Sequence, residues 1–114
     1  MRFSFYLLFS VLLVACSKHP TILGNFSAGQ PASISELATN SSPNSVVVSG
    51  KLIEKCPIAG CWFYLEDKTG RIKVDTKSAG FVVLDVPLGK EVEVSGTVAR
   101  NGSEKLIEAQ GLKF

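Results

Sequence analysis

The sequence predicts a small all-β protein whose five short strands close into a barrel. From residue 45 onward, apolar and polar residues alternate with a period of two, which is typical of strands that bury one face. Glycine, proline and asparagine interrupt this alternation at short intervals, where turns are needed. The roughly 70 residues in this region suffice for five strands but are few for a seven-stranded sandwich. We therefore expect one partly open Greek-key barrel of the oligonucleotide/oligosaccharide-binding (OB) type.

The first three strands follow one another through two short connections. They are expected over residues 45–55, 62–67 and 71–75, with a bulge or bend at Gly50 and a turn at 67–70. This turn sets a hairpin register that pairs apolar residues on one face and polar or aromatic residues on the other. The expected pairs are Leu65 with Ile72, Phe63 with Val74, Tyr64 with Lys73, Glu66 with Arg71 and Trp62 with Asp75.

The last two strands are expected to form a second hairpin around Asn101 and Gly102. A three-residue loop gives the pairs Val98 with Leu106 and Val92 with Leu112. This register requires a bulge near Gly111 or an open barrel end. Between the two hairpins, residues 76–89 have no clear period, and residues 81–84 are expected to be a short strand or a buried plug.

A short helix is expected in front of the barrel, over residues 31–38. Ser33 is placed to cap it, and Glu36 follows three residues later as in a capping box. Because so short a helix is not stable alone, it must pack on the barrel.

The N-terminal segment has the features of a bacterial lipoprotein signal. Arg2 precedes an almost wholly apolar run, which is shorter than the roughly 20 residues of a membrane span. Residues 13–16 resemble the site where a lipoprotein signal is cut and Cys16 is acylated, for example with palmitate. The alternative is an ordinary cleaved signal peptide. We expect a signal peptide at 1–15, a lipidated flexible tether at 16–30 and the OB-like domain at 31–114.

This segment places the chain in the bacterial cell envelope, lipid-anchored and facing the periplasm. Ser17 after the acylated cysteine favours the outer membrane. Loss of residues 1–15 removes Arg2 alone among the charged residues, which lowers the net charge from +2 to +1. A nearly balanced surface has no long-range attraction for nucleic acid. The expected partners are the membrane and an envelope protein or small anionic ligand, with a monomeric domain.

Cys56 and Cys61 are the only cysteines outside the N-terminal segment, and they flank a turn with Pro57 and Gly60. Export to an oxidising compartment predicts a structural disulfide between them and no cofactor. The alternative is a copper or zinc site, although nearby histidine and methionine ligands are missing. The third interpretation, a redox-active dithiol, lacks the Cys-x-x-Cys spacing and the helix N-terminus that lower a thiol pKa.

One face of the first hairpin is expected to carry Trp62, Tyr64, Arg71 and Lys73. OB barrels bind ligands on this face, where aromatic rings stack and basic groups meet anions. The alternative is that the helix covers Trp62, while Tyr64 and Lys73 form an ordinary cross-strand pair. The expected domain has no histidine and no recognisable catalytic set, so we do not expect an enzyme.

Four short runs carry a resemblance to a known family: Ile34-Ser35-Glu36-Leu37, Val48-Ser49-Gly50-Lys51-Leu52, Gly60-Cys61-Trp62 and Ala79-Gly80-Phe81. Over residues 31–114 the chain resembles an uncharacterised family of exported bacterial OB-like domains with a cysteine before a Gly-Cys-Trp motif. The family tends to have methionine where this chain has Phe63, which removes a possible thioether ligand. The resemblance implies the fold and no settled activity.

Together these features predict a membrane-anchored envelope module for binding or assembly. Cys56 and Cys61 would be its disulfide staple, and the face of strands two and three its contact surface. The alternative function is soft-metal binding or delivery, with copper or zinc held by the same two cysteines.

Overall fold

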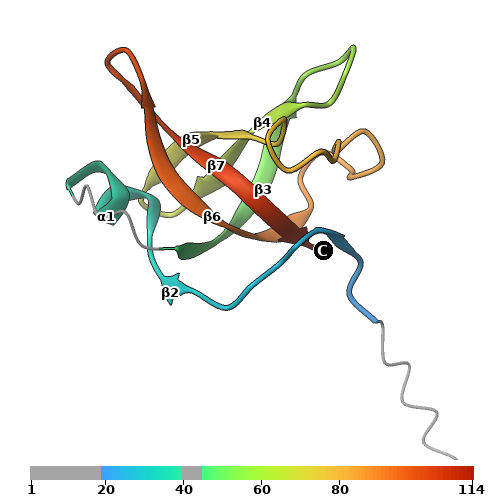
Figure 1. The fold of residues 1–114 in the computed structure, drawn as a ribbon, viewed down its shortest axis with the longest axis horizontal. Helices are drawn as coiled ribbons and strands as arrows, with labels where there is room; N and C mark the ends of the chain where they lie inside the picture. The colour runs from blue at the N-terminus through green and yellow to red at the C-terminus, as the bar shows by residue number, and fades with distance from the viewer. Residues whose placement is uncertain (1–18, 40–44) are drawn as a thin grey trace, which may run out of the picture.

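A computed structural model describes residues 19–39 and 45–114 of the chain. Its central unit is a closed barrel, shown in Figure 1, of the strands β3 (Val46–Lys55), β4 (Trp62–Asp67), β5 (Gly70–Asp75), β6 (Glu91–Asn101) and β7 (Glu104–Lys113). β3 pairs antiparallel with β4 and β6, and β4 with β5 and β6 with β7 are antiparallel too. The parallel pairing of β5 with β7 closes the ring. The predicted all-β, OB-like barrel is confirmed.

The β4–β5 hairpin has the predicted register at all five pairs, from Trp62 with Asp75 to Glu66 with Arg71. The prediction for β3 was wrong in one detail, because its irregularity lies between Leu52 and Glu54 instead of at Gly50. Gly50 has another purpose. A Cβ atom there would lie 2.5 Å from the main-chain oxygen of Glu66, so glycine allows β3 and β4 to approach closely.

The register of the β6–β7 hairpin differs by one residue from the prediction. Val98 pairs with Ile107 instead of Leu106, and Val94 takes the place of Val92 opposite Leu112. The reason is the turn. Asn101 and Glu104 are themselves a pair, so the connection has two central residues where three were expected.

The predicted bulge near Gly111 is confirmed. Ser95 pairs with Gly111 and Gly96 with Ala109, which leaves Gln110 without a partner in this ladder. The chain before the barrel packs at this point: a Cβ atom on Gly111 would lie 2.4 Å from the Cα atom of Phe26.

Part of the expected tether therefore lies along the barrel. β1 (Ile22–Gly24) pairs antiparallel with β7, and β2 (Gln30–Pro31) pairs parallel with β3. The expected signal peptide and Cys16 lie outside the described residues. Within the described ranges, no helix is both long enough and apolar enough to span a membrane.

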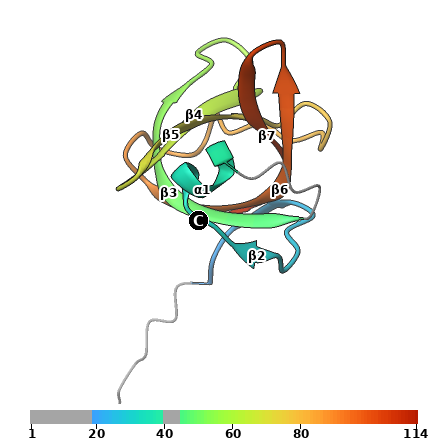
Figure 2. The same ribbon diagram turned by 90° about the vertical axis from the view of Figure 1, so that its left-hand side faces the viewer.

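The helix α1 (Ile34–Thr39) lies at one end of the barrel, within the ring of strands in Figure 2. Ile34 and Leu37 are buried in the main hydrophobic core. The predicted cap is confirmed, because the Ser33 hydroxyl accepts a hydrogen bond from the Glu36 amide at 3.4 Å. Burial of one apolar face explains how so short a helix is held.

The β4–β5 turn fastens α1 to the barrel. The Ile34 amide donates to Asp67 Oδ2 at 2.9 Å, and the Ser35 amide donates to Thr69 Oγ1 at 3.0 Å. Asp67 Oδ1 accepts from the Thr69 amide, the Thr69 hydroxyl and the Gly70 amide. Partial burial raises the pKa of Asp67. The hydrogen bonds outweigh this effect and hold the pKa below its ordinary value.

The opposite end of the barrel is closed by residues 76–90, which we call the plug loop. It contains turns but no strand, and Val83 and Val86 are fully buried. Residues 81–84 form no strand, and the buried plug is confirmed only in part, because Val83 is buried while Val82 and Leu84 are exposed.

We expect Asp67→Ala to lower the free energy of unfolding by about 1–3 kcal/mol near pH 7, because four donors lose their acceptor. A carboxyl group whose folded pKa is depressed stabilises the fold above its unfolded pKa of about 3.9, and this contribution disappears as the pH falls through the folded value. In urea denaturation, the difference in free energy of unfolding between wild type and variant should thus become smaller below about pH 4. The control is Asp85→Ala, since Asp85 is exposed. If this difference in free energy of unfolding did not change with pH, the stabilisation would not come from the ionised Asp67 carboxylate.

Candidate functional site

The four predicted side chains lie together on the outer face of the β4–β5 hairpin. The rings of Trp62 and Tyr64 meet edge to face, with centroids 5.9 Å apart and planes at 78°. Lys73 Nζ lies 5.4 Å from the centre of the Trp62 ring, and Arg71 Cζ lies 5.2 Å from the centre of the Tyr64 ring. We call Trp62, Tyr64, Arg71 and Lys73 the aromatic–basic ladder.

Diagonal contacts between strands build this ladder. Lys73 is directly opposite Tyr64 in the register, but its ammonium lies over the ring of Trp62. Arg71 is opposite Glu66 and reaches the ring of Tyr64 in the same way. Both cations are thus displaced by two residues in one direction, as diagonal neighbours in a twisted antiparallel pair can be. The predicted Tyr64–Lys73 cross-strand pair is present in the register, and the cation–π contact of Lys73 is with Trp62.

The helix does not cover Trp62. α1 is hydrogen-bonded to Asp67 and Thr69, whereas Trp62 begins β4 at the other end of the strand. Five residues of strand separate these ends by about 17 Å. Trp62 and Tyr64 remain half-buried and reachable from solvent.

Acidic groups border the ladder without neutralising it. Arg71 Nη2 lies 4.0 Å from Glu54 Oε2, and both side chains are more than half exposed, at 54% and 58%. An exposed ion pair of this kind contributes about 0–1 kcal/mol, so Arg71 stays available to a ligand.

The two cysteines lie in the turn at 56–61, which we call the cysteine turn. They are free thiols 4.4 Å apart, whereas a disulfide bond needs about 2.05 Å. The predicted disulfide is therefore not formed in this structure. Main-chain hydrogen bonds hold the turn without it: the Gly60 amide donates to the Cys56 oxygen, and the Cys56 amide donates to the Trp62 oxygen, both at 3.1 Å.

Cys56 has an environment that the sequence reasoning missed. Hydrogen bonds from the amides of Ala59 and Ile58 outweigh the effect of burial on its thiol, with the Gly60 amide and the Cys61 side chain adding to them. Together they hold the pKa of Cys56 below its ordinary value, because each favours the thiolate. The Pro57 and Gly60 signals indicated a turn here, but not where its amides would point.

Metal ligands are scarce around the turn. In residues 19–39 and 45–114, no group of three or more histidine, cysteine, aspartate or glutamate side chains is arranged to hold a metal ion. The predicted alternative site would therefore consist of Cys56 and Cys61 as a pair.

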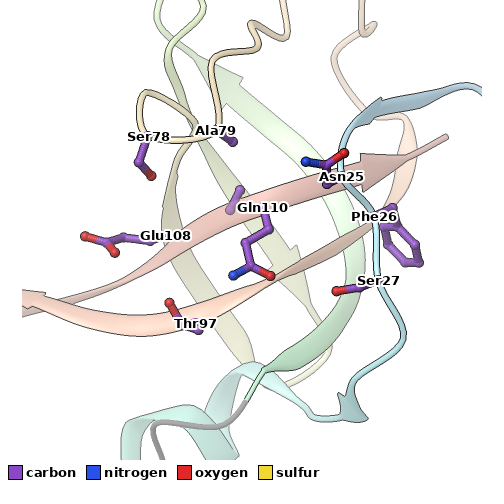
Figure 3. A pocket seen from close by; sticks show the side chains of 9 residues that line it. Asn25, Phe26, Ser27, Ser78, Ala79, Thr97, Glu108 and Gln110 are labelled. Carbon is purple, nitrogen blue, oxygen red and sulfur yellow. The ribbon is translucent and has the colours of Figure 1, made fainter.

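A surface groove of about 580 Å³ lies elsewhere, over the β6–β7 sheet. Figure 3 shows Thr97, Glu108 and Gln110 on these strands, with residues 25–27 and 78–79 at its margins. Its lining is mostly polar side chains, and no ladder residue contributes to it. Sequence patterns did not indicate it, because four stretches of chain that are separate in the sequence form it.

Comparisons with known proteins support the fold alone. No protein-family model matches the sequence, and no curated protein matches it. The structure is similar to that of the hypothetical protein ygiW from E. coli, with a TM-score of 0.58 and 22% sequence identity, over 81% of this chain and 100% of that one. The lipoprotein family resemblance is not confirmed by these comparisons.

The ladder geometry predicts how Trp62 responds to ionic quenchers. The chain has one tryptophan, so its emission reports this site alone. Because the Lys73 ammonium lies over the ring, iodide should quench more efficiently than caesium, relative to free N-acetyltryptophanamide. Lys73→Met should reduce this preference by about twofold, while the control Lys68→Met, in the exposed β4–β5 turn, should leave it unchanged. Equal effects of both substitutions would show that Lys73 does not sit at the ring in solution.

Proposed function

We propose that this chain is a binding module of the bacterial envelope, and that the aromatic–basic ladder engages an anionic ligand with a planar or cyclic group. The observation that carries the proposal is the pair of cations held over two half-buried rings, at 5.4 and 5.2 Å. They lie on the outer face of β4 and β5, which are the second and third strands of the barrel, and OB barrels bind ligands on this face. We assign no catalysis to the ladder.

The contacts within the ladder are weak enough for a ligand to replace. A cation over an exposed aromatic ring contributes about 0.5–1 kcal/mol. An anion can draw the Lys73 ammonium from the Trp62 ring, which frees that ring for stacking. One ligand would then gain both an ion pair and a stacking contact.

The envelope location in this proposal rests on the lipoprotein-like residues 13–16. Acyl chains on Cys16 would anchor the chain to the outer membrane, with a monomeric barrel on the periplasmic side. A net charge of +1 after removal of residues 1–15 disfavours nucleic acid as the ligand and suits a small anion or an acidic partner protein. The expected Cys56–Cys61 disulfide would be the oxidised state of the cysteine turn in this compartment.

Soft-metal binding is the second candidate function. It is supported by the two free thiols 4.4 Å apart, which lie close enough for one copper(I) ion to bridge two thiolates. Metal analysis of the chain purified without oxygen distinguishes it, since one equivalent of copper or zinc bound through both cysteines would favour this candidate.

A sulfated oligosaccharide prepared from heparin is a suitable probe of the ladder. We expect the oligosaccharide to bind with an affinity that falls as the salt concentration rises. Trp62→Ala or Lys73→Met should lower this affinity by about tenfold, because each substitution removes a stacking or charge contact. Isothermal titration calorimetry measures this directly.

The matched control is Lys113→Met. Lys113 also lies over an aromatic ring, 5.2 Å from that of Phe26, and it pairs with Glu93 at 3.0 Å. It lies outside the ladder, so its loss should change the affinity less than twofold. A loss equal to that of Lys73→Met would mean that the probe senses only net charge, which contradicts a defined site.

A further inference from the structure

We propose that Cys56 and Cys61 are a thiol–disulfide exchange pair, in which Cys56 attacks a disulfide of an apolar polypeptide segment and Cys61 resolves the mixed disulfide. This inference is independent of the ladder and of its ligand. The geometry supports it first. Both thiols are free, partly exposed and 4.4 Å apart, so a modest movement within one turn brings them to bonding distance.

The cysteine turn stabilises a negative charge on Cys56. The amides of Ala59 and Ile58 lower the pKa of its thiol, whereas the Gly60 amide also donates to the Cys56 main-chain oxygen at 3.1 Å. Exchange requires the thiolate as nucleophile, so these donors favour Cys56 for the first attack.

Thr76 supplies an independent observation next to Cys61. Its side chain is fully buried, and in the described part of the chain its hydroxyl has no hydrogen-bond partner. The Thr76 amide donates to the Cys61 oxygen at 2.9 Å, and the β4–β5 register continues to place these two residues opposite each other.

This register puts the two side chains on the same face. Phe63 and Val74, the next inward pair, are in the core, so Cys61 and Thr76 also project inward. Opposite residues have Cβ atoms about 4.5–5.5 Å apart. The Thr76 hydroxyl is therefore an unpaired donor on the same face as the second sulfur, although it makes no hydrogen bond to that sulfur in this structure.

An apolar rim surrounds the cysteine turn and fits a polypeptide partner. Figure 1 shows this turn and the plug loop at the same end of the barrel, opposite α1. Five large hydrophobic side chains are exposed in the described residues, and four of them lie on these two segments: Ile58, Val82, Leu84 and Leu88. Leu84 packs directly at Gly60, because a Cβ atom there would lie 2.8 Å from Leu84 Cγ. A partner disulfide flanked by apolar residues can bury this rim as it reaches the thiols.

Lys55 keeps the rim in place. Its ammonium donates to the main-chain oxygens of Val83, Leu84 and Val86, at 3.4, 2.8 and 2.6 Å. The Val83 amide donates to the Gly60 oxygen at 2.9 Å. The plug loop and the cysteine turn are thus one connected unit.

The exchange proceeds in two balanced steps. The Cys56 thiolate attacks one sulfur of a partner disulfide, a Cys56–partner disulfide forms, and the other partner sulfur leaves as a thiolate and takes a proton from solvent. Cys61 then releases its proton to solvent and attacks the Cys56 sulfur, which forms the Cys56–Cys61 disulfide and expels the first partner sulfur, likewise protonated. The chain loses two electrons and two protons, and the partner disulfide becomes two thiols. Run in reverse, the oxidised pair would oxidise a partner dithiol.

Dithiobis(nitrobenzoate) is the probe disulfide for the reduced full chain, and released thionitrobenzoate is counted relative to a Cys56→Ser/Cys61→Ser double variant. Wild type should release two equivalents and end with an internal disulfide, two hydrogens lighter by mass. Cys61→Ser should release one equivalent at the wild-type rate and keep the adduct on Cys56. Cys56→Ser should react about tenfold more slowly. Equal rates for the two single variants, two retained adducts in wild type, or a metal ion that blocks both sulfurs would overturn the proposal.

The Thr76→Val variant tests whether the Thr76 hydroxyl assists the Cys61 step or only supports the fold. We expect the first release at the wild-type rate and the second slowed about threefold or more, because the donor beside Cys61 is gone. The control Thr97→Val, on β6, should change neither phase. Equal slowing of both phases by Thr76→Val would refute this role for the hydroxyl.

The rim is tested with two nitrobenzoate-capped peptides, Leu-Cys-Leu and Ser-Cys-Ser. Wild type should prefer the first by about threefold or more, and Leu84→Ser should remove the preference. If wild type shows no preference, the polypeptide assignment is wrong.

Discussion

The register of the β4–β5 hairpin is the constraint on which the rest of the structure depends. Phe63 and Leu65 on β4 are fully buried, and their partners Val74 and Ile72 are in the core. Since strand side chains alternate, a slip of one residue would expose this apolar set to water. The same alternation sends the aromatic–basic ladder outward. It also sends Cys61 and Thr76 inward, so one register determines both candidate sites.

The sequence predicted the register of the β4–β5 hairpin but not that of the β6–β7 hairpin, and the reason lies in the residues around each turn. The β4–β5 turn separates residues whose apolar and charged partners agree on both faces, so only one register satisfies them. Around Asn101 and Gly102, loops of two and three residues both leave aliphatic residues opposite one another. The periodicity therefore could not choose between Leu106 and Ile107 as the partner of Val98. Packing of Phe26 against Gly111 adds a contact from a distant segment that no local pattern contains.

The candidate site shows the same division. Alternation alone placed the four ladder side chains on one face, but the diagonal displacement of Lys73 and Arg71 depends on strand twist, which the sequence does not state. Whether α1 covers Trp62 depends on where the helix docks, and this is decided by Asp67 and Thr69 more than thirty residues away. The disulfide was inferred from compartment and spacing. Neither the compartment nor the cysteine spacing shows in which direction the amides of a turn point.

The turns at the two ends of β4 differ in the side chain that interacts with their amides. Turns leave amides without partners, and a side-chain acceptor has to accept their hydrogen bonds. At one end the acceptor is the Asp67 carboxylate, which is ionised at neutral pH, so its hydrogen bonds are always present and serve the fold. At the other end the amides of Ala59 and Ile58 lower the pKa of the Cys56 thiol. A thiol accepts weakly while neutral and strongly once ionised, so the same arrangement of amides there favours a reactive state. The cysteine turn makes this possible, because a regular strand would pair the amides of Ile58 and Ala59 with the main-chain oxygens of a neighbouring strand.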